Sequence, residues 1–191
     1  MTGLRRGILL GVVGTLVVLI AIALLVIFTG GYNVAATDRH RSLVAWAFDS
    51  TMRNSVQGRA GELEPPDTFT EAMIVAGAGE YKSMCEHCHG GVGVEHADWA
   101  AVMAPNPPPL ARATDNWTTA EVFWLVRHGV KMTGMPAFGP SHDEQTLWNI
   151  AAFVKALPNM TAEEYAAFPA GHGAEEEAGH SHAEGTPPHE H

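Results

Sequence analysis

The sequence is poor in cysteine and in basic residues, and each shortage excludes a class of protein. Only two of the 191 residues are cysteines, so a fold held by several disulfides is excluded. Lysine and arginine number 11 against 21 acidic residues, which gives a formal net charge of -10. Nucleic-acid binding needs clustered positive charge, so we predict no nucleic-acid partner. No internal repeat is visible, which excludes a repeat array.

One long apolar run stands at the N-terminus. Residues 7–28 are apolar apart from Thr15 and a few glycines, which is about the length that crosses a hydrocarbon core as a helix. Arg5 and Arg6 precede the run, and the positive-inside rule therefore places the N-terminus in the cytoplasm. We predict a transmembrane anchor over residues 1–29 in the inner (cytoplasmic) membrane, with the rest of the chain in the periplasm.

A cleaved signal peptide is the alternative interpretation of this run. Val34 and Ala36 would occupy the small-residue positions before the cut. The run exceeds the roughly 7–15 apolar residues of a usual signal peptide, which favours the uncleaved anchor.

Residues 30–67 form the next segment. Leu43, Trp46, Met52 and Val56 recur at loosely helical spacing among arginines, which predicts an amphipathic helix over residues 38–60. We interpret it as a helical stalk; contact with lipid headgroups or with a partner's membrane domain is the alternative. The pair Pro65-Pro66 then marks a linker.

The following part of the chain, residues 68–160, is predicted to be a single all-α domain. Helices are expected over residues 69–84, 119–128 and 143–157, and the Pro-rich stretch 92–113 is expected to be a loop. Thr118 with Glu121 forms a capping box, and Ser141 with Glu144 repeats the pattern. Four tryptophans of this domain are expected in its core: Trp99, Trp117, Trp124 and Trp148.

The chemistry is carried by the sequence Cys85-Glu86-His87-Cys88-His89. The C-x-x-C-H pattern is that of covalent haem c attachment, in which two thiols add to the vinyl groups and the final histidine binds the iron. We therefore predict one covalent haem c on Cys85 and Cys88 with His89 as an axial ligand, while His87 faces away. A thioredoxin-like pair would need a βαβ context, and a zinc site would need further cysteines.

A later loop supplies the predicted sixth ligand. Met135 lies in a Gly/Pro-rich frame from residue 134 to residue 139, where its sulfur can project inward. Met132 and His128 are the alternatives. With both axial positions filled, the iron would exchange electrons without binding substrate.

From about residue 69 to residue 158 the chain resembles a class I cytochrome c. Gly77 and Tyr81 match the residues at which that family's N-terminal helix crosses its C-terminal helix, and Ile150 and Phe153 match the facing positions. The resemblance also implies that a prolyl carbonyl accepts the Nδ1 proton of the proximal histidine. We assign this role to Pro108, with Pro109 as the alternative.

Residues 161–191 are predicted to be an acidic, His-rich disordered tail, because the composition is too polar to offset the entropy of ordering. Imidazole and carboxylate groups could hold transition metals weakly there, and an expression tag is a further interpretation. The histidines are His172, His180, His182, His189 and His191.

These features together predict a membrane-anchored monohaem cytochrome c that is not itself an enzyme. It would pass single electrons between a respiratory quinol-oxidising complex or dehydrogenase and a terminal oxidase or reductase. The alternatives are a haem enzyme or gas sensor with a displaceable methionine, and a metal-handling protein that uses its tail.

Overall fold

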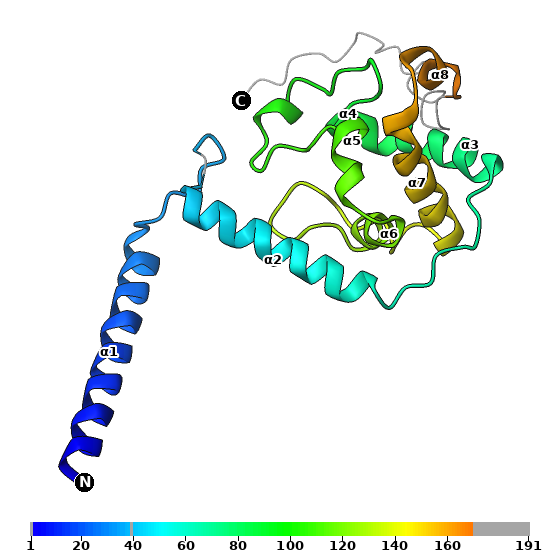
Figure 1. Ribbon diagram of the computed structural model, residues 1–191. Helices are drawn as coiled ribbons and strands as arrows, with labels where there is room; N and C mark the ends of the chain where they lie inside the picture. The colour runs from blue at the N-terminus through cyan, green and yellow to red at the C-terminus, as the bar shows by residue number, and fades with distance from the viewer. Residues whose placement is uncertain (1, 39, 170–191) are drawn as a thin grey trace, which may run out of the picture. The chain divides into compact units, whose positions relative to one another are not determined.

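The computed structural model describes residues 2–38 and 40–169, and within these ranges the chain is helical and forms no β-strand (Figure 1). The α-helices are α1 (Thr2–Thr29), α2 (Ser42–Ala60), α3 (Glu71–Glu80), α4 (Glu86–His89), α5 (Leu110–Ala113), α6 (Thr119–His128), α7 (Glu144–Ala156) and α8 (Ala162–Ala167). A π-helical turn η1 (Tyr81–Cys85) joins α3 to α4, and three short 3-10 turns are η2 (Ala100–Val102), η3 (Thr114–Asn116) and η4 (Leu157–Asn159). The all-α prediction is confirmed. The described residues form two compact units, residues 2–38 and residues 40–169.

The first unit consists of α1 and the short segment that follows it. Within Gly3–Thr29 an 18-residue window has a mean hydropathy of 3.1, and 27 residues at about 1.5 Å rise each are long enough to cross a membrane. The hydroxyls of Thr15 and Thr29 donate to the carbonyls of Gly11 and Leu25 at 2.9 and 2.6 Å. These two polar side chains are thus satisfied within the helix, as an apolar environment requires.

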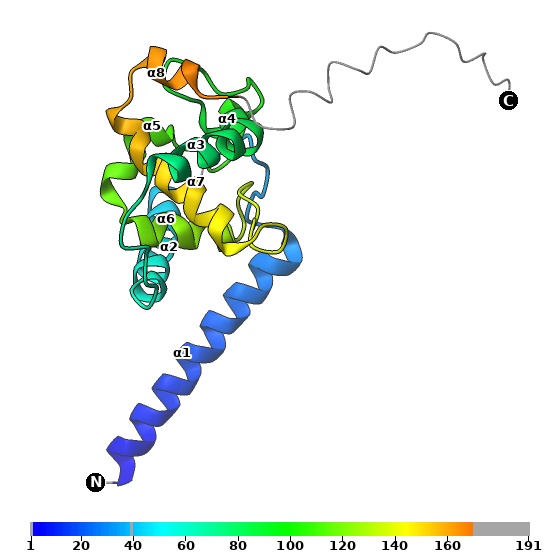
Figure 2. The same cartoon turned by 90° about the vertical axis from the view of Figure 1, so that its right-hand side faces the viewer.

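The second unit is organised by the crossing of α3 on α7 (Figure 2). Gly77 lies at the crossing, where a Cβ atom would come 2.0 Å from the carbonyl oxygen of Asn149 and 3.0 Å from the amide nitrogen of Ile150. No side chain larger than hydrogen fits at this distance. The helix contact expected at Gly77 is therefore present as a backbone-to-backbone approach.

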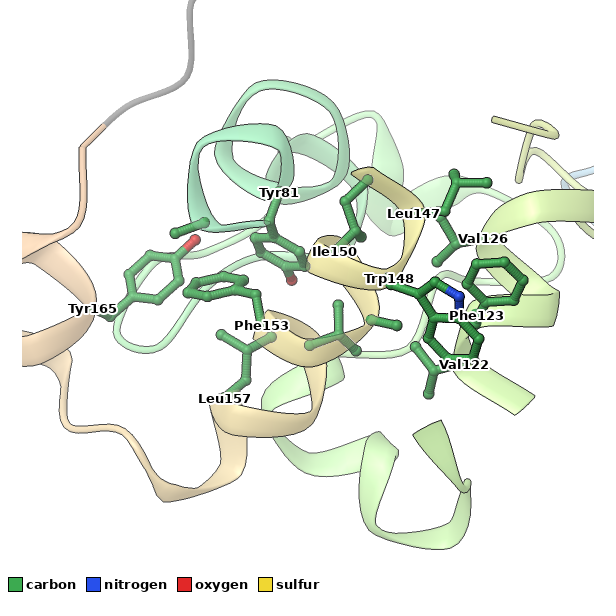
Figure 3. Packing of buried hydrophobic residues seen from close by; sticks show 13 residues of the cluster. Tyr81, Val122, Phe123, Val126, Leu147, Trp148, Ile150, Phe153, Leu157 and Tyr165 are labelled. Atoms are coloured by element: carbon green, nitrogen blue, oxygen red, sulfur yellow. The ribbon is translucent and has the colours of Figure 1, made fainter. Parts of the chain in front are cut away.

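Aromatic rings fill the core on either side of this crossing. Figure 3 shows Tyr81, Phe153 and Tyr165 grouped together, with the Tyr81 and Phe153 ring centroids 5.3 Å apart. Phe123 and Trp148 stack at 3.9 Å nearer the other end of α7. Trp148 is buried as predicted, and Trp117 and Trp124 are partly buried. The prediction for Trp99 is wrong, because its side chain lies in the loop before η2 and is 55% exposed.

The starts of two helices in this unit test the capping predictions. The capping box of Thr118 with Glu121 is confirmed, and α6 has the predicted bounds. At α7 the N-cap is Asp143, whose carboxylate accepts the Thr146 amide at 2.7 Å. The predicted box of Ser141 with Glu144 is wrong, because the Ser141 hydroxyl instead bonds the Phe138 carbonyl of the preceding turn.

The amphipathic helix predicted over residues 38–60 forms as α2, which starts at Ser42 and belongs to the second unit. Val56 and Ala60 are buried where α2 packs against α6. The Arg53 guanidinium lies 5.3 Å from the centre of the Trp117 ring, a cation–π contact. Leu43 and Trp46 in the first turns remain exposed.

The folded part continues past residue 160, where the sequence predicts the tail to begin. Residues 162–167 form α8, which has its own capping box of Thr161 with Glu164, and Tyr165 is 1% exposed. The boundary is wrong because two aromatic residues, Tyr165 and Phe168, pack on the core and stabilise the segment. The remainder of the predicted tail, residues 170–191, lies outside the described residues.

The close helix contact at Gly77 predicts that the stability of the second unit depends strongly on having no side chain larger than hydrogen at this position. Gly77→Ala should destabilise the second unit by about 2–3 kcal/mol, because the helices must separate to admit the methyl group. Gly58→Ala is the matched control, since Gly58 lies in α2 with open space around it. That control should stabilise the protein by ~0.5–1 kcal/mol. Equal unfolding midpoints in denaturant for both variants would contradict the crossing geometry.

The Asp143 cap predicts a specific response to acid. Hydrogen bonds from Thr146 lower the pKa of Asp143 below its ordinary value of 3.8. A depressed folded-state pKa contributes stability above the unfolded pKa, and this contribution is lost as the pH falls through the folded value. Asp143→Asn keeps a capping oxygen but does not titrate, so it should lose less stability than the parent protein between about pH 6 and about pH 2.

Denaturant midpoints across that interval measure this effect. Asp115→Asn, which removes an exposed carboxylate from η3, serves as the control and should follow the parent protein. An identical acid response in Asp143→Asn and the parent would show that the cap does not contribute.

Candidate haem site

The C-x-x-C-H motif occupies the end of a continuous helical segment that changes pitch. The π-helical turn η1 ends at Cys85, and α4 then carries Cys88 and His89. Gly90 ends α4 with φ +67, and a Cβ atom there would lie 2.8 Å from the Val94 carbonyl oxygen. A π-turn inserts an extra residue into a helix and is frequent at functional sites. The motif thus lies between the π-helical turn η1 and Gly90, the residue that ends α4.

The two thiols are not bonded to each other. Burial, with negative charge at Cys88 and Glu80 as a smaller cause, raises the pKa of Cys85 to about 12. A reactive redox thiol has the opposite shift. Across residues 2–38 and 40–169, no three His, Cys, Asp or Glu side chains are grouped as metal ligands. These observations disfavour both the thioredoxin-like and the zinc interpretations of the motif.

His89 is oriented by a residue from a distant loop. Its Nδ1 lies 2.8 Å from the carbonyl oxygen of Pro108, and a carbonyl only accepts, so Nδ1 carries the proton. Burial lowers the pKa of His89, and the bond to Pro108 opposes this shift. The neutral imidazole therefore keeps the Nε2 lone pair free for a metal. His87, between the cysteines, is exposed to solvent.

The predicted sixth ligand lies in the loop between α6 and α7. Its start is fixed by Gly129 with φ +63, where a Cβ atom would lie 2.6 Å from the carbonyl carbon of Pro136. Within the loop, the Met135 amide donates to the Thr133 hydroxyl at 3.1 Å and the Met135 carbonyl accepts from the Val130 amide at 3.2 Å. Met135 is therefore held at both of its backbone polar groups.

The burial of the three candidate side chains differs. Met135 is partly buried, whereas Met132 is 79% exposed and has a φ of 62. His128 is exposed at the end of α6, with its ring 4.7 Å from that of Trp124. The local geometry favours Met135 over both alternatives.

Met103 is a residue that the sequence analysis missed. Its methyl carbon lies only 1.9 Å from the position that a Cβ atom would take on Gly134, next to Met135. Met103 belongs to the same Pro-rich loop as Pro108, and the Ala97 amide at the start of that loop donates to the His87 carbonyl at 2.8 Å. One loop thus contacts both the attachment helix and the methionine loop. No local sequence signal points to this contact.

Two further polar residues fix the backbone around the site. The Tyr81 hydroxyl donates to the Gly90 carbonyl at 2.6 Å, which ties the start of η1 to the end of α4. The Lys155 ammonium of α7 donates to the carbonyls of Thr114 and Trp117 at 2.8 and 2.7 Å, which holds the segment after Pro108. The sequence identified Tyr81 only as a packing residue.

The donor set fits a haem c. It has two thiols three residues apart, a neutral imidazole oriented through Nδ1, and a thioether in a constrained loop, which are the groups that attach and ligate this cofactor.

Comparison with known proteins agrees with this chemistry. Residues 72–154 match the family model described as cytochrome C oxidase, cbb3-type, subunit III. No curated protein and no solved structure matches the chain. The matched segment contains most of α3, the C-x-x-C-H motif, the methionine loop and most of α7. Residues 72–154 therefore form a c-type cytochrome domain, and a domain of this family holds covalently bound haem c.

Proposed function

We propose that the chain is a membrane-anchored monohaem cytochrome in which Cys85 and Cys88 form the thioethers, and His89 and Met135 are the axial ligands. The observation that carries the proposal is the 2.8 Å contact between His89 Nδ1 and the Pro108 carbonyl. It orients the imidazole and fixes its tautomer, which is the usual support of a metal-binding histidine. The loop that holds Met135 by both of its backbone polar groups would supply the second axial ligand.

The haem, when bound, supplies a one-electron couple, and the chain controls it through the two axial groups. The hydrogen bond to Pro108 makes the His89 imidazole a better donor, while a thioether ligand favours the ferrous state and raises the reduction potential. If both side chains ligate the iron, neither axial position stays open for a substrate. This arrangement supports an electron carrier or an electron-transfer subunit rather than an enzyme acting alone.

The partners follow from the family and from α1. The matched family is named for subunit III of a cbb3-type cytochrome C oxidase. We propose that this chain passes electrons from a quinol-oxidising complex or a dehydrogenase to a terminal oxidase or reductase, as a carrier or as a subunit. The helix α1, with Arg5 and Arg6 at its cytoplasmic end, would keep the haem unit at the periplasmic face of the inner membrane. Such anchoring raises its effective concentration near membrane partners.

The axial assignment predicts the effect of removing the thioether. Met135→Ala should open one axial position, so that ferrous protein binds carbon monoxide and the reduction potential falls. Met132→Ala is the matched control in the same loop and should leave the spectrum unchanged, because that side chain points into solvent. His87→Ala should also change little.

Absorption spectra of both oxidation states, with and without carbon monoxide, test this assignment. An unaltered spectrum in Met135→Ala, or loss of the low-spin spectrum in Met132→Ala, would refute it. Ready carbon monoxide binding by the parent protein would instead favour a haem enzyme or gas sensor.

The anchor predicts where the full-length chain is found after expression with haem maturation. The chain should stay in the membrane fraction after an alkaline wash, and its intact mass should include residues 1–36, because an apolar helix of this length partitions stably into lipid. Recovery of a soluble haem protein that begins after Ala36 would show that the helix is a signal peptide.

A further inference from the structure

The helix α8 lies outside the segment that matches the family, yet it packs directly on the attachment motif. The family match ends at residue 154, and α8 spans Ala162–Ala167. Tyr165 is 1% exposed, and its ring lies 6.5 Å from that of Tyr81 and 6.1 Å from that of Phe153 (Figure 3). Tyr165 therefore enters the same aromatic group that supports the start of η1.

Charged side chains on the attachment segment bind α8 at two points. The Tyr165 hydroxyl donates to the carboxylate of Glu86, which lies inside the C-x-x-C-H motif. The Lys82 ammonium donates to the Phe168 carbonyl at 2.5 Å and lies 4.9 Å from the centre of the Tyr165 ring. One contact falls before Cys85 and the other between the two cysteines.

Two glycines that follow the motif leave room for α8 to pack against it. A Cβ atom on Gly91 would lie 2.5 Å from the Tyr165 ring, and one on Gly93 would lie 2.8 Å from the Ala162 methyl group. Gly93 also has φ +78. The segment on each side of the attachment helix is thus shaped around α8.

We infer that α8 is a clamp in which Tyr165, as a positioning residue, fixes the Glu86 carboxylate beside the haem-attachment turn and lowers the reduction potential. The inference rests on the proposed haem attachment at Cys85 and Cys88. A negative charge held near the iron stabilises the ferric state over the less positive ferrous state. Held on a buried hydroxyl, the carboxylate acts at short range, whereas a released one moves into solvent and is screened. The Lys82 cation, which contacts the Tyr165 ring of α8, acts in the opposite sense and raises the potential.

The test compares reduction potentials of the full-length haem protein carrying Tyr165→Phe, Glu86→Gln or both. Tyr165→Phe keeps the ring and deletes only the donor, so it frees the carboxylate, and Glu86→Gln removes the charge. Each single variant should raise the potential, so that the ratio of reduced to oxidised protein at a fixed poise rises on the order of threefold to tenfold. The double variant should equal Glu86→Gln alone, because both changes act through one carboxylate.

Glu71→Gln is the matched control for the carboxylate. Glu71 lies 15 residues before Glu86 along the helical segment, about 20 Å away and beyond a Debye length. The reduction potential of Glu71→Gln should therefore match that of the parent protein. A purely structural role for Tyr165 would lower the unfolding temperature and leave the potential unchanged.

Three results would overturn the clamp: an unchanged potential in either single variant, additive shifts in the double variant, or an equal shift in Glu71→Gln. If Tyr165→Phe fails to mature, Glu86→Gln still tests the charge with the hydroxyl and ring in place. A parent protein that lacks a low-spin spectrum or covalent haem would refute the proposed axial site instead, so the two failures are distinguishable.

Discussion

The second unit depends on one close contact, the approach of the α3 backbone at Gly77 to the α7 backbone at Asn149. Because the two helices meet without a side chain between them, the residues one turn further along α3 and α7 reach each other, and Tyr81 packs on Phe153. Tyr81 in turn bonds the Gly90 carbonyl at the end of the attachment helix. The position of the C-x-x-C-H motif is therefore set by a backbone contact two turns before it.

The rest of the site is assembled by loops that attach to this pair of helices. The Pro-rich loop reaches His89 through Pro108, and its Met103 packs on Gly134 of the methionine loop. Lys155 on α7 holds the segment that follows this loop. One loop thus contacts both His89 and the loop of Met135. A change in its packing would therefore shift both candidate axial ligands. This sharing explains why a ligand set spread from residue 85 to residue 135 can be constrained by few residues.

The sequence predicted best where the determining contacts are local. Thr118, Glu121 and Gly129 lie within one helix length and gave the bounds of α6 correctly. At α7, Ser141 and Asp143 are both good N-caps, and only the packing of the Phe138 turn decides between them. The pairing of His89 with Pro108 came from the family resemblance rather than from spacing. Met103 and Tyr165 could not be found, because a single side chain that docks on a distant segment leaves no periodic pattern.

The docking of α2 limits how far the haem unit can travel. If the whole segment from residue 30 to residue 67 were a stalk and linker, the haem unit could sample a wide volume above the bilayer. Since Val56 and Ala60 fix α2 to α6, only residues 30–41 lie between α1 and the docked helix α2. Twelve residues span at most about 40 Å when fully extended and about 20 Å on average as a flexible coil. If α1 anchors the chain as proposed, the electron donor and acceptor that it serves must be close neighbours in the membrane. A distant pair would need the chain to diffuse laterally with its anchor.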